Sequence, residues 1–88
     1  MKKIEYYHNK NIIFNQLRIT RKKAGLTQNE LAAKMQVLNI NIDQQMIGRI
    51  ENNKRMVTDY ELATLCKILK IDEKTLLKDY HDDLFTQN

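Results

Sequence analysis

The sequence predicts an all-α fold, a compact single domain of five helices. No segment alternates polar and apolar residues as a half-buried strand does, the chain has no proline, and its only glycines are Gly25 and Gly48. At 88 residues the chain is too short to bury two separate cores. It has one cysteine, and its Cys, His and acidic residues lack ligand spacing. We therefore expect helix packing alone to stabilise the domain, without a disulfide, a metal or a cofactor.

A first helix is predicted from about Asn11 to Ala24. Ile13, Leu17 and Ala24 recur near the three- and four-residue spacing of a helix face that packs on a core. Gly25 then suits the left-handed backbone position at which many helices end, because a residue with a side chain enters it only with strain.

A second helix is predicted to begin at Thr27 and Glu30, which have the spacing of a capping box. In that motif the hydroxyl accepts a hydrogen bond from the glutamate amide, and the carboxylate accepts one from the threonine amide. One face of this helix is apolar and holds Leu31, Ala32, Met35 and Leu38. Asn39 tolerates the left-handed conformation and is expected to end the helix.

A third helix is predicted to follow the link at residues 39–42. Asp43 has the short acceptor side chain and the negative charge that suit a helix N-terminus. Ile47 and Ile50 are expected to face inward. The outward positions of the helix then hold Gln44, Gln45, Gly48 and Arg49.

Two further helices complete the predicted fold. Thr58 and Glu61 form a second capping box. The fourth helix behind it carries an apolar stripe of Leu62, Leu65, Cys66 and Leu69. A fifth helix is expected to begin at Asp72 and to bury Leu76, Leu77 and Tyr80.

Positive charge is concentrated in the first part of the chain. Residues 1–55 hold eleven Lys or Arg against four Asp or Glu, whereas residues 56–88 hold four against seven. This asymmetry is typical of a protein that binds a polyanion, although solvated surfaces are often lopsided too. A cluster on the first helix is expected to face such a partner: Arg18, Arg21, Lys22 and Lys23. The basic arm with Lys2, Lys3 and Lys10 would either follow phosphates or remain a loose end.

Two linked motifs carry a family resemblance. They are Leu26-Thr27-Gln28-Asn29-Glu30-Leu31-Ala32 and Met46-Ile47-Gly48-Arg49-Ile50-Glu51-Asn52-Asn53-Lys54-Arg55. Leu17-Arg18 and Arg21 precede them, and Tyr60-Glu61-Leu62-Ala63 follows. Over roughly residues 14–77 the chain thus resembles the lambda-repressor-like (XRE-type) helix-turn-helix regulators of phages and bacteria. The resemblance implies a DNA-binding domain at residues 11–80 with the helix-turn-helix at about 28–52, a basic arm at 1–10 and a tail at 81–88.

The resemblance also implies roles for single residues. In such proteins the third helix reads bases in the major groove, and Gln44, Gln45 and Arg49 match the reading positions. Glutamine can pair with adenine and arginine with guanine. The positions that hold DNA phosphates are matched by Gln28, Asn52, Asn53, Lys54 and Arg55, and Arg18 of the first-helix cluster is also expected to bind a phosphate. Without the capped helix before them, exposed glutamines and arginines would be interpreted as ordinary surface residues.

Two features depart from the family pattern. The link at residues 39–42 follows an extended second helix, where such proteins often have a turn of three or four residues with a glycine. It leaves the geometry between Gln28 and Gln44 open. Asn53 stands where glycine is frequent, although asparagine is the best replacement at positive φ.

The remaining chemistry-bearing residues predict no further site. Cys66 lies in an apolar stripe and is expected to be buried. His8 and His81 lack partners at ligand spacing, and Asp82-Asp83 lies in a polar tail. The sequence assembles no nucleophile, base and oxyanion donor, so we do not expect an enzyme. No apolar run reaches bilayer length and no signal peptide follows Met1, so we expect a cytoplasmic, nucleoid-associated protein.

These observations lead us to interpret the chain as a sequence-specific regulator that binds double-stranded DNA. We expect a repressor that binds an inverted-repeat operator as a homodimer. The residues expected to pair two copies are Leu76, Tyr80, Leu84 and Phe85. One alternative is an antitoxin or protein-interaction module that binds a partner protein such as a toxin and regulates its own operon. Another is a scaffold that has kept the fold but lost DNA binding.

Overall fold

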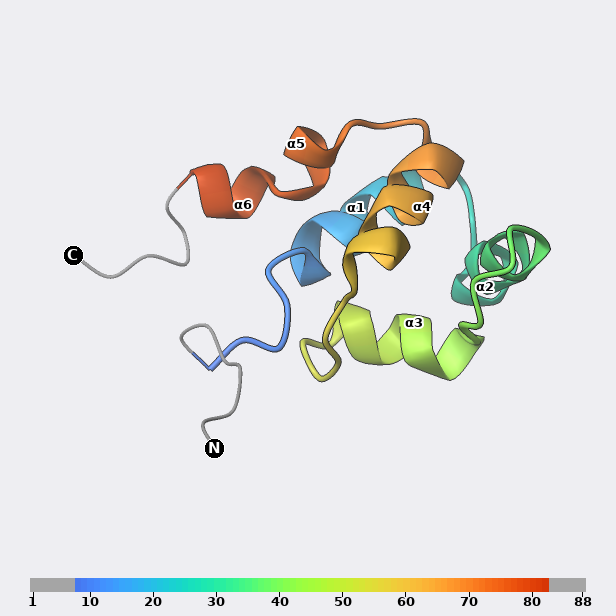
Figure 1. Cartoon of the computed structure of the whole chain (residues 1–88). Helices are drawn as coiled ribbons and strands as arrows, with labels where there is room; N and C mark the ends of the chain where they lie inside the picture. The colour runs from blue at the N-terminus through green and yellow to red at the C-terminus, as the bar shows by residue number, and fades with distance from the viewer. Residues whose placement is uncertain (1–7, 83–88) are drawn as a thin grey trace.

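Helices make up almost all of the regular structure in the computed structural model, which describes residues 8–82 (Figure 1). They are α1 (Phe14–Lys23), α2 (Gln28–Val37), α3 (Gln44–Glu51), α4 (Asp59–Leu69), α5 (Glu73–Leu76) and α6 (Lys78–His81). Residues 8–82 contain no strand, which confirms the predicted all-α fold. In Figure 1, α3 lies along the lower edge and α4 above it, with α1 behind them and α2 at the right.

The core lies where the first four helices meet, and α5 closes one end of it. Its fully buried apolar side chains are Leu17, Leu31, Met35, Ile42, Ile47, Ile50, Leu65 and Leu76. They come from α1 to α5 and from the link before α3. Removing this apolar surface from water, at about 25 cal/mol per Å², is the main force that holds the helices together.

The predicted helix caps are confirmed. The Thr27 hydroxyl accepts a hydrogen bond from the Glu30 amide at 3.0 Å, and the Glu30 carboxylate accepts from the Thr27 amide at 2.9 Å. A second capping box is present at the start of α4. Asp43 caps α3 through the amide of the third helical residue, and Asp72 caps α5 in the same way. Each of the four helix starts therefore satisfies an otherwise unpaired backbone amide.

The first helix is shorter than predicted. Asn11 is not helical; its side-chain amide donates to the carbonyl of Ile50 at 3.0 Å and to that of Arg55 at 2.9 Å. Its side-chain oxygen accepts from the Ile13 amide at 3.0 Å. The prediction that Ala24 faces the core was wrong, because the helix ends at Lys23 and Ala24 is exposed. Gly25 takes the predicted left-handed position with φ 73°.

The link between α2 and α3 is held by both backbone and side chains. Asn39 adopts the predicted left-handed conformation with φ 64°. The prediction that Leu38 packs in the core was wrong, because the chain reverses beside it and leaves it 40% exposed. Ile42 takes that place in the core and is fully buried, while Gln36 donates to its carbonyl at 2.9 Å.

The predicted fifth helix is two short helices that meet at Leu77. Leu76 is buried, Leu77 is half-buried, and Tyr80 is 39% exposed, so the prediction that Tyr80 is buried was wrong. Asp79 turns inward instead, because amides of α1 satisfy its carboxylate. Gln16 donates to Asp79 at 2.9 Å. The inner face of α6 thus holds a buried carboxylate with hydrogen-bond partners, and the tyrosine beside it lies toward solvent.

Candidate nucleic-acid interface

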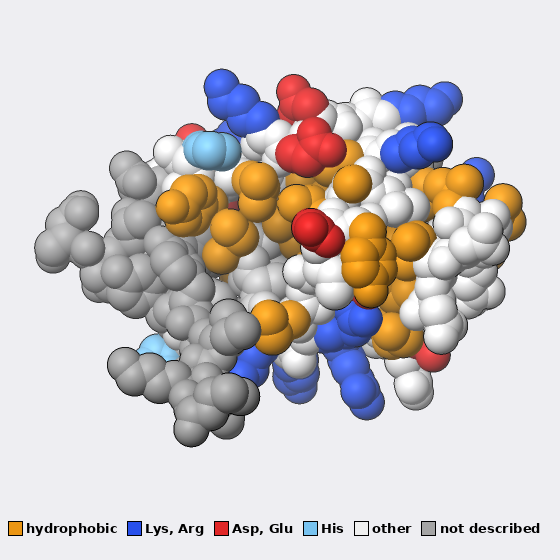
Figure 2. Space-filling model, in the orientation of Figure 1, with side chains coloured by type: hydrophobic (Ala, Val, Ile, Leu, Met, Phe, Trp, Pro, Cys, Tyr) orange, Lys and Arg blue, Asp and Glu red, His pale blue; other side chains and the backbone are white. Residues whose placement is uncertain are grey.

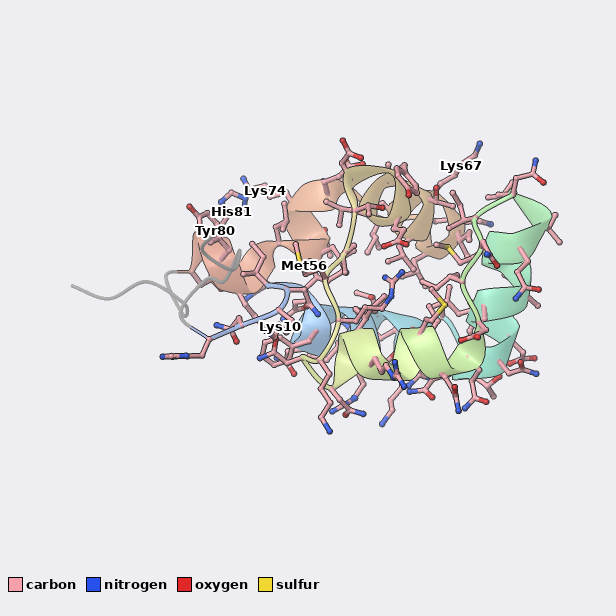
Figure 3. All side chains as sticks on the ribbon, turned by 60° about the horizontal axis from the view of Figure 1, so that its bottom comes forward. Lys10, Met56, Lys67, Lys74, Tyr80 and His81 are labelled. Atoms are coloured by element: carbon pink, nitrogen blue, oxygen red, sulfur yellow. The ribbon has the colours of Figure 1, made fainter. Side chains whose placement is uncertain are left out.

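The outer face of α3 presents the side chains predicted to read bases. Gln44, Gln45 and Arg49 are exposed, whereas Ile47 and Ile50 anchor the opposite face in the core. The helix is eight residues long and is capped at its start by an aspartate. It is therefore fixed to the domain by its inner face, and its polar first turn is open to solvent (Figure 3).

The N-terminal ends of α2 and α3 lie side by side. Gln44 donates from Nε2 to Oε1 of Gln28 across 3.4 Å, and Gln28 in turn donates to Glu51 across 3.1 Å. Gly48 lies directly beneath Gln28, since a Cβ on this glycine would be 3.5 Å from Oε1 of Gln28. The long link at residues 39–42 therefore brings Gln28 and Gln44 together, which answers the question left open by the sequence.

A buried carboxylate organises the residues behind this face. The side chain of Glu51 is 0% exposed and receives Arg21 at two points, with 2.6 Å from Nε to Oε2 and 3.0 Å from Nη2 to Oε1. Arg18 approaches it at 3.5 Å. Burial raises the pKa of Glu51, but the hydrogen bonds from Arg21 and Gln28 outweigh that effect and hold the pKa below its ordinary value.

The first-helix cluster is therefore divided between two roles. The expectation that Arg21 faces the partner was wrong, because its side chain is only 10% exposed and pairs with Glu51. Arg18 is 42% exposed and also donates to the side chain of Asn52 at 3.0 Å. Lys22 and Lys23 are exposed. Sequence analysis did not single out Glu51. Its position one turn after Ile47 places it on the buried face of α3, and a buried carboxylate there needs a cationic partner.

The loop after α3 is fixed to the N-terminal segment. Asn53 adopts φ 60°, and its side-chain oxygen accepts from the Lys10 amide at 2.8 Å. Its side-chain amide donates to Asn9 at 2.7 Å. We name this set of contacts the Asn53 clasp. The predicted phosphate-holding side chain of Asn53 is thus already engaged within the domain, and its tolerance of positive φ is confirmed.

Arg55 is likewise engaged within the domain. Its guanidinium donates to both carboxylate oxygens of Glu61, at 2.9 Å and 3.0 Å. Burial raises the pKa of Glu61, but the hydrogen bonds from Arg55 and the Thr58 amide outweigh it and leave the pKa lowered. Lys54, by contrast, is exposed and forms no ion pair with any residue of the described 8–82 range.

Exposed basic side chains lie along the edge formed by α3 and its following loop, where Arg49 and Lys54 are exposed. In Figure 2, which has the orientation of Figure 1, Lys and Arg side chains project from this lower edge. Exposed glutamines, an open helix N-terminus and basic side chains therefore share one face. Such a face suits a major groove flanked by phosphates.

Residues 17–76 match a family model described as helix-turn-helix. The chain belongs to the XRE-type, lambda-repressor-like helix-turn-helix family. The family consists of DNA-binding transcription regulators and not of enzymes. In this helix-turn-helix domain α2 and α3 are the paired helices, and α3 lies along one edge of the domain (Figure 1). No curated protein is similar enough to the chain to be matched.

The described part of the chain holds no metal site, no membrane-spanning helix and no reactive cysteine. No three His, Cys, Asp or Glu residues within 8–82 lie together as a metal site would require. Over the same part of the chain, no helix is long and apolar enough to cross a membrane. Cys66 is buried as predicted, and burial raises the pKa of its thiol to about 11.

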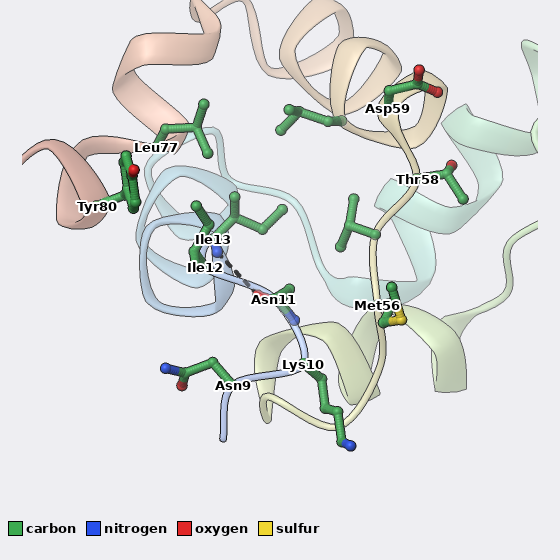
Figure 4. Close-up of a pocket in the computed structure, with 12 residues that line it drawn as sticks. Asn9, Lys10, Asn11, Ile12, Ile13, Met56, Thr58, Asp59, Leu77 and Tyr80 are labelled. Atoms are coloured by element: carbon green, nitrogen blue, oxygen red, sulfur yellow. Dashed lines mark hydrogen bonds between the residues drawn. The ribbon is translucent and has the colours of Figure 1, made fainter. Parts of the chain in front are cut away.

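An apolar groove of about 440 Å³ runs between the N-terminal segment, the start of α4 and α6 (Figure 4). Its apolar lining includes Ile12, Ile13, Met56, Val57, Leu62, Leu77 and Tyr80. Of the residues predicted to pair two copies, Leu76 is fully buried in the core, so that prediction was wrong for this residue. Tyr80 borders the groove, and Leu84 and Phe85 lie outside the described residues.

Proposed function

We propose that this chain is a sequence-specific repressor that reads double-stranded DNA with α3 in the major groove. One observation carries the proposal: Gln44 is exposed at the start of α3 and hydrogen-bonded to Gln28 at the start of α2. Two helix N-termini that meet at one exposed edge offer a polar reading surface beside a phosphate-binding position.

Base reading is assigned to Gln44, Gln45 and Arg49. A glutamine amide donates and accepts at once and so fits N6 and N7 of adenine, whereas a guanidinium donates twice and fits O6 and N7 of guanine. We expect Gln45 to contribute most to base reading, because it is exposed in the first turn of α3 and, unlike that of Gln44, its side chain is held by no hydrogen bond within residues 8–82.

Phosphate binding is assigned mainly to Gln28, Arg18, Asn52 and Lys54. Gln28 combines its amide with the positive end of α2, and Lys54 contributes an exposed ammonium group that no carboxylate of residues 8–82 pairs with. Asn53 and Arg55 contribute less directly. Their side chains hold the loop in shape, and the backbone of that loop would contact a phosphate.

The repressor acts as a homodimer on an inverted repeat. One small domain makes few base contacts, whereas two copies on half-sites about one helical turn apart combine their contacts. The second copy is expected to cover the groove beside Tyr80, because a partner on the same duplex binds next to this domain and the groove exposes apolar surface there. Leu84 and Phe85 follow Tyr80 closely in the chain and would extend that contact.

The experiment that tests this function is selection of bound duplexes from a random pool. A palindromic consensus with two half-sites would support sequence reading by a dimer. A single half-site would remove the homodimer from the proposal, and a pool with no enriched sequence would reject specific reading altogether. The same selection with Gln45→Ala should alter the consensus at one position in each half-site.

A further inference from the structure

A hollow of about 400 Å³ lies between the C-terminal ends of α2 and α4. Its lining residues are Lys34, Val37, Leu38, Lys67, Ile68 and Lys70. In Figure 3, Lys67 projects at the upper right near the end of α2, whereas α3 forms the lower edge. The hollow therefore lies across the domain from the face assigned to DNA, and DNA reading does not explain its composition.

The floor and wall of this hollow are apolar. Val37 is 80% exposed, more than any other large apolar side chain of residues 8–82, and its neighbour Leu38 is 40% exposed. Ile68 of α4 is half-buried against the core and completes the surface. Single exposed apolar residues are common, but three that line one hollow form a surface that gains free energy when a partner covers it.

The rim of the hollow is basic. Lys34, Lys67 and Lys70 are all exposed, and none of them forms an ion pair with another described residue. Glu30, one turn before Lys34, interacts with it electrostatically, but its carboxylate accepts a hydrogen bond from the Thr27 amide in the capping box and forms no ion pair with Lys34. Three ammonium groups around an apolar surface complement a ligand that is apolar at its centre and acidic at its edges.

The backbone at Lys70 supports a role for this charge. Lys70 ends α4 in the left-handed conformation with φ 58°, a position usually taken by glycine because a side chain there is strained. A positive charge near a helix C-terminus stabilises the helix dipole, but Lys67 in the last turn already supplies one. The dipole therefore does not require a lysine at the strained position.

We propose that this hollow is the docking site for an acidic amphipathic helix of a partner protein. Apolar side chains one turn apart on that helix would enter the hollow over Val37 and Ile68, and flanking carboxylates would meet the three ammonium groups. A helix fits better than a membrane surface, because only three cations surround the apolar site, fewer than the basic clusters that bind anionic lipids. This binding is separate from DNA reading and does not depend on it.

The test is a selection of random 16-residue peptides on the full chain, followed by affinity measurement and mapping of the bound surface by NMR. The recovered peptides should be rich in Asp and Glu, with apolar residues at helical spacing. Their binding should weaken about tenfold or more for Lys67→Glu and for Val37→Ser, and also weaken with added salt. The matched control is Lys74→Glu on α5, which is exposed but lies away from the hollow and should bind as the unaltered chain does.

Several results would overturn the docking proposal. One is the recovery of peptides without an acidic bias, and another is binding that Lys67→Glu and Val37→Ser leave unchanged. A third is a selection in which the unaltered chain enriches no peptide more strongly than the Lys67→Glu variant does. Vesicles that contain phosphatidylserine serve as a comparison, and binding to them in place of the peptides would assign the hollow to a membrane. If Lys67→Glu weakens duplex DNA binding as strongly as Lys54→Ala does, the lysines belong to the DNA interface instead.

Lys70→Gly separates a binding role from a structural one. Glycine relieves the left-handed strain, so the melting temperature should stay the same or rise. Peptide affinity should nevertheless fall about two- to fivefold with the loss of one ion pair. A variant that loses stability while it keeps full affinity would show that Lys70 serves only the fold.

Discussion

Arg21 holds Glu51 at two points, with Nε 2.6 Å from Oε2 and Nη2 3.0 Å from Oε1, and the carboxylate is fully buried. The pair links α1 to the last residue of α3, so it fixes the helix that carries the base-reading side chains. A buried charge that loses its partner is costly because nothing replaces the lost solvation.

Arg21→Ala should therefore lower the free energy of unfolding by about 3–5 kcal/mol, measured by urea denaturation. Lys22→Ala is the matched control, because this neighbouring cation is exposed and its loss should cost no more than about 0.5 kcal/mol. Similar losses for the two variants would contradict the role given to the Arg21–Glu51 pair.

The two buried glutamates should make the stability of the fold decrease at acidic pH. Glu51 and Glu61 have pKa values below the ordinary glutamate value of 4.5 when the chain is folded. Their contribution is complete above that value and is lost as the pH falls through the lower folded-state pKa. The melting temperature should drop steeply below about pH 4.5. Glu61→Gln should be less stable than the unaltered chain at pH 7, and the two curves should converge in acid; parallel curves would contradict this explanation.

Gln45 and Lys54 should differ in what they contribute to DNA binding. Gln45→Ala should lose about 1–3 kcal/mol of discrimination at one base pair, measured by fluorescence anisotropy on matched and mismatched duplexes. Lys54→Ala should weaken all duplexes alike and reduce the salt slope by about 1. If both variants change affinity for every duplex in the same way, the division into base-reading and phosphate-binding residues is wrong.

The Asn53 clasp can be tested by comparing two substitutions at one position. Asn53→Ala loses the hydrogen bonds to Asn9 and Lys10 and also strains a left-handed backbone, so it should destabilise by about 2 kcal/mol. Asn53→Gly loses the same bonds without the strain and should cost about half as much. In both variants the Lys10 amide should exchange hydrogen faster than in the unaltered chain. Unchanged exchange would show that the clasp does not hold the N-terminal segment.

Cys66 should react only when the domain unfolds. Burial, with smaller contributions from the charges of Glu73 and Asp72, raises the pKa of its thiol to about 11, so little reactive thiolate exists near neutral pH. Alkylation by iodoacetamide at pH 8 should be slow in buffer and should accelerate with urea in parallel with unfolding. Rapid alkylation of the folded chain would mean that the thiol is accessible.

The starts of α2 and α4 and the ends of α1 and α2 could be predicted because they depend on neighbours in the sequence. Thr27 with Glu30 and Thr58 with Glu61 form local hydrogen bonds that any compact fold would preserve. The positive φ of Gly25 and Asn39 follows from backbone preferences at single residues. The exposed side of α3 was likewise fixed by the spacing of Ile47 and Ile50.

Long-range polar contacts escaped prediction because the sequence does not show which distant groups meet. Asn11 was placed inside a helix, yet it bonds to carbonyls of residues 50 and 55. Arg21 was placed on the DNA side, yet it pairs with a carboxylate thirty positions away in the chain. Asp79 was passed over in favour of Tyr80 because hydrophobicity alone ranks a tyrosine as the better core residue. In each case a specific partner outweighed the local pattern.

Ile42 anchors the link between α2 and α3 in the core. Because this side chain is fully buried directly before the Asp43 cap, it fixes the start of α3 in the core. The turn before it is held as well, since the Ile40 amide donates to the carbonyl of Met35 at 3.0 Å and Ile40 packs against the core. A related chain with a longer or shorter link would therefore present the same edge to a duplex only if it kept an apolar residue just before the aspartate cap.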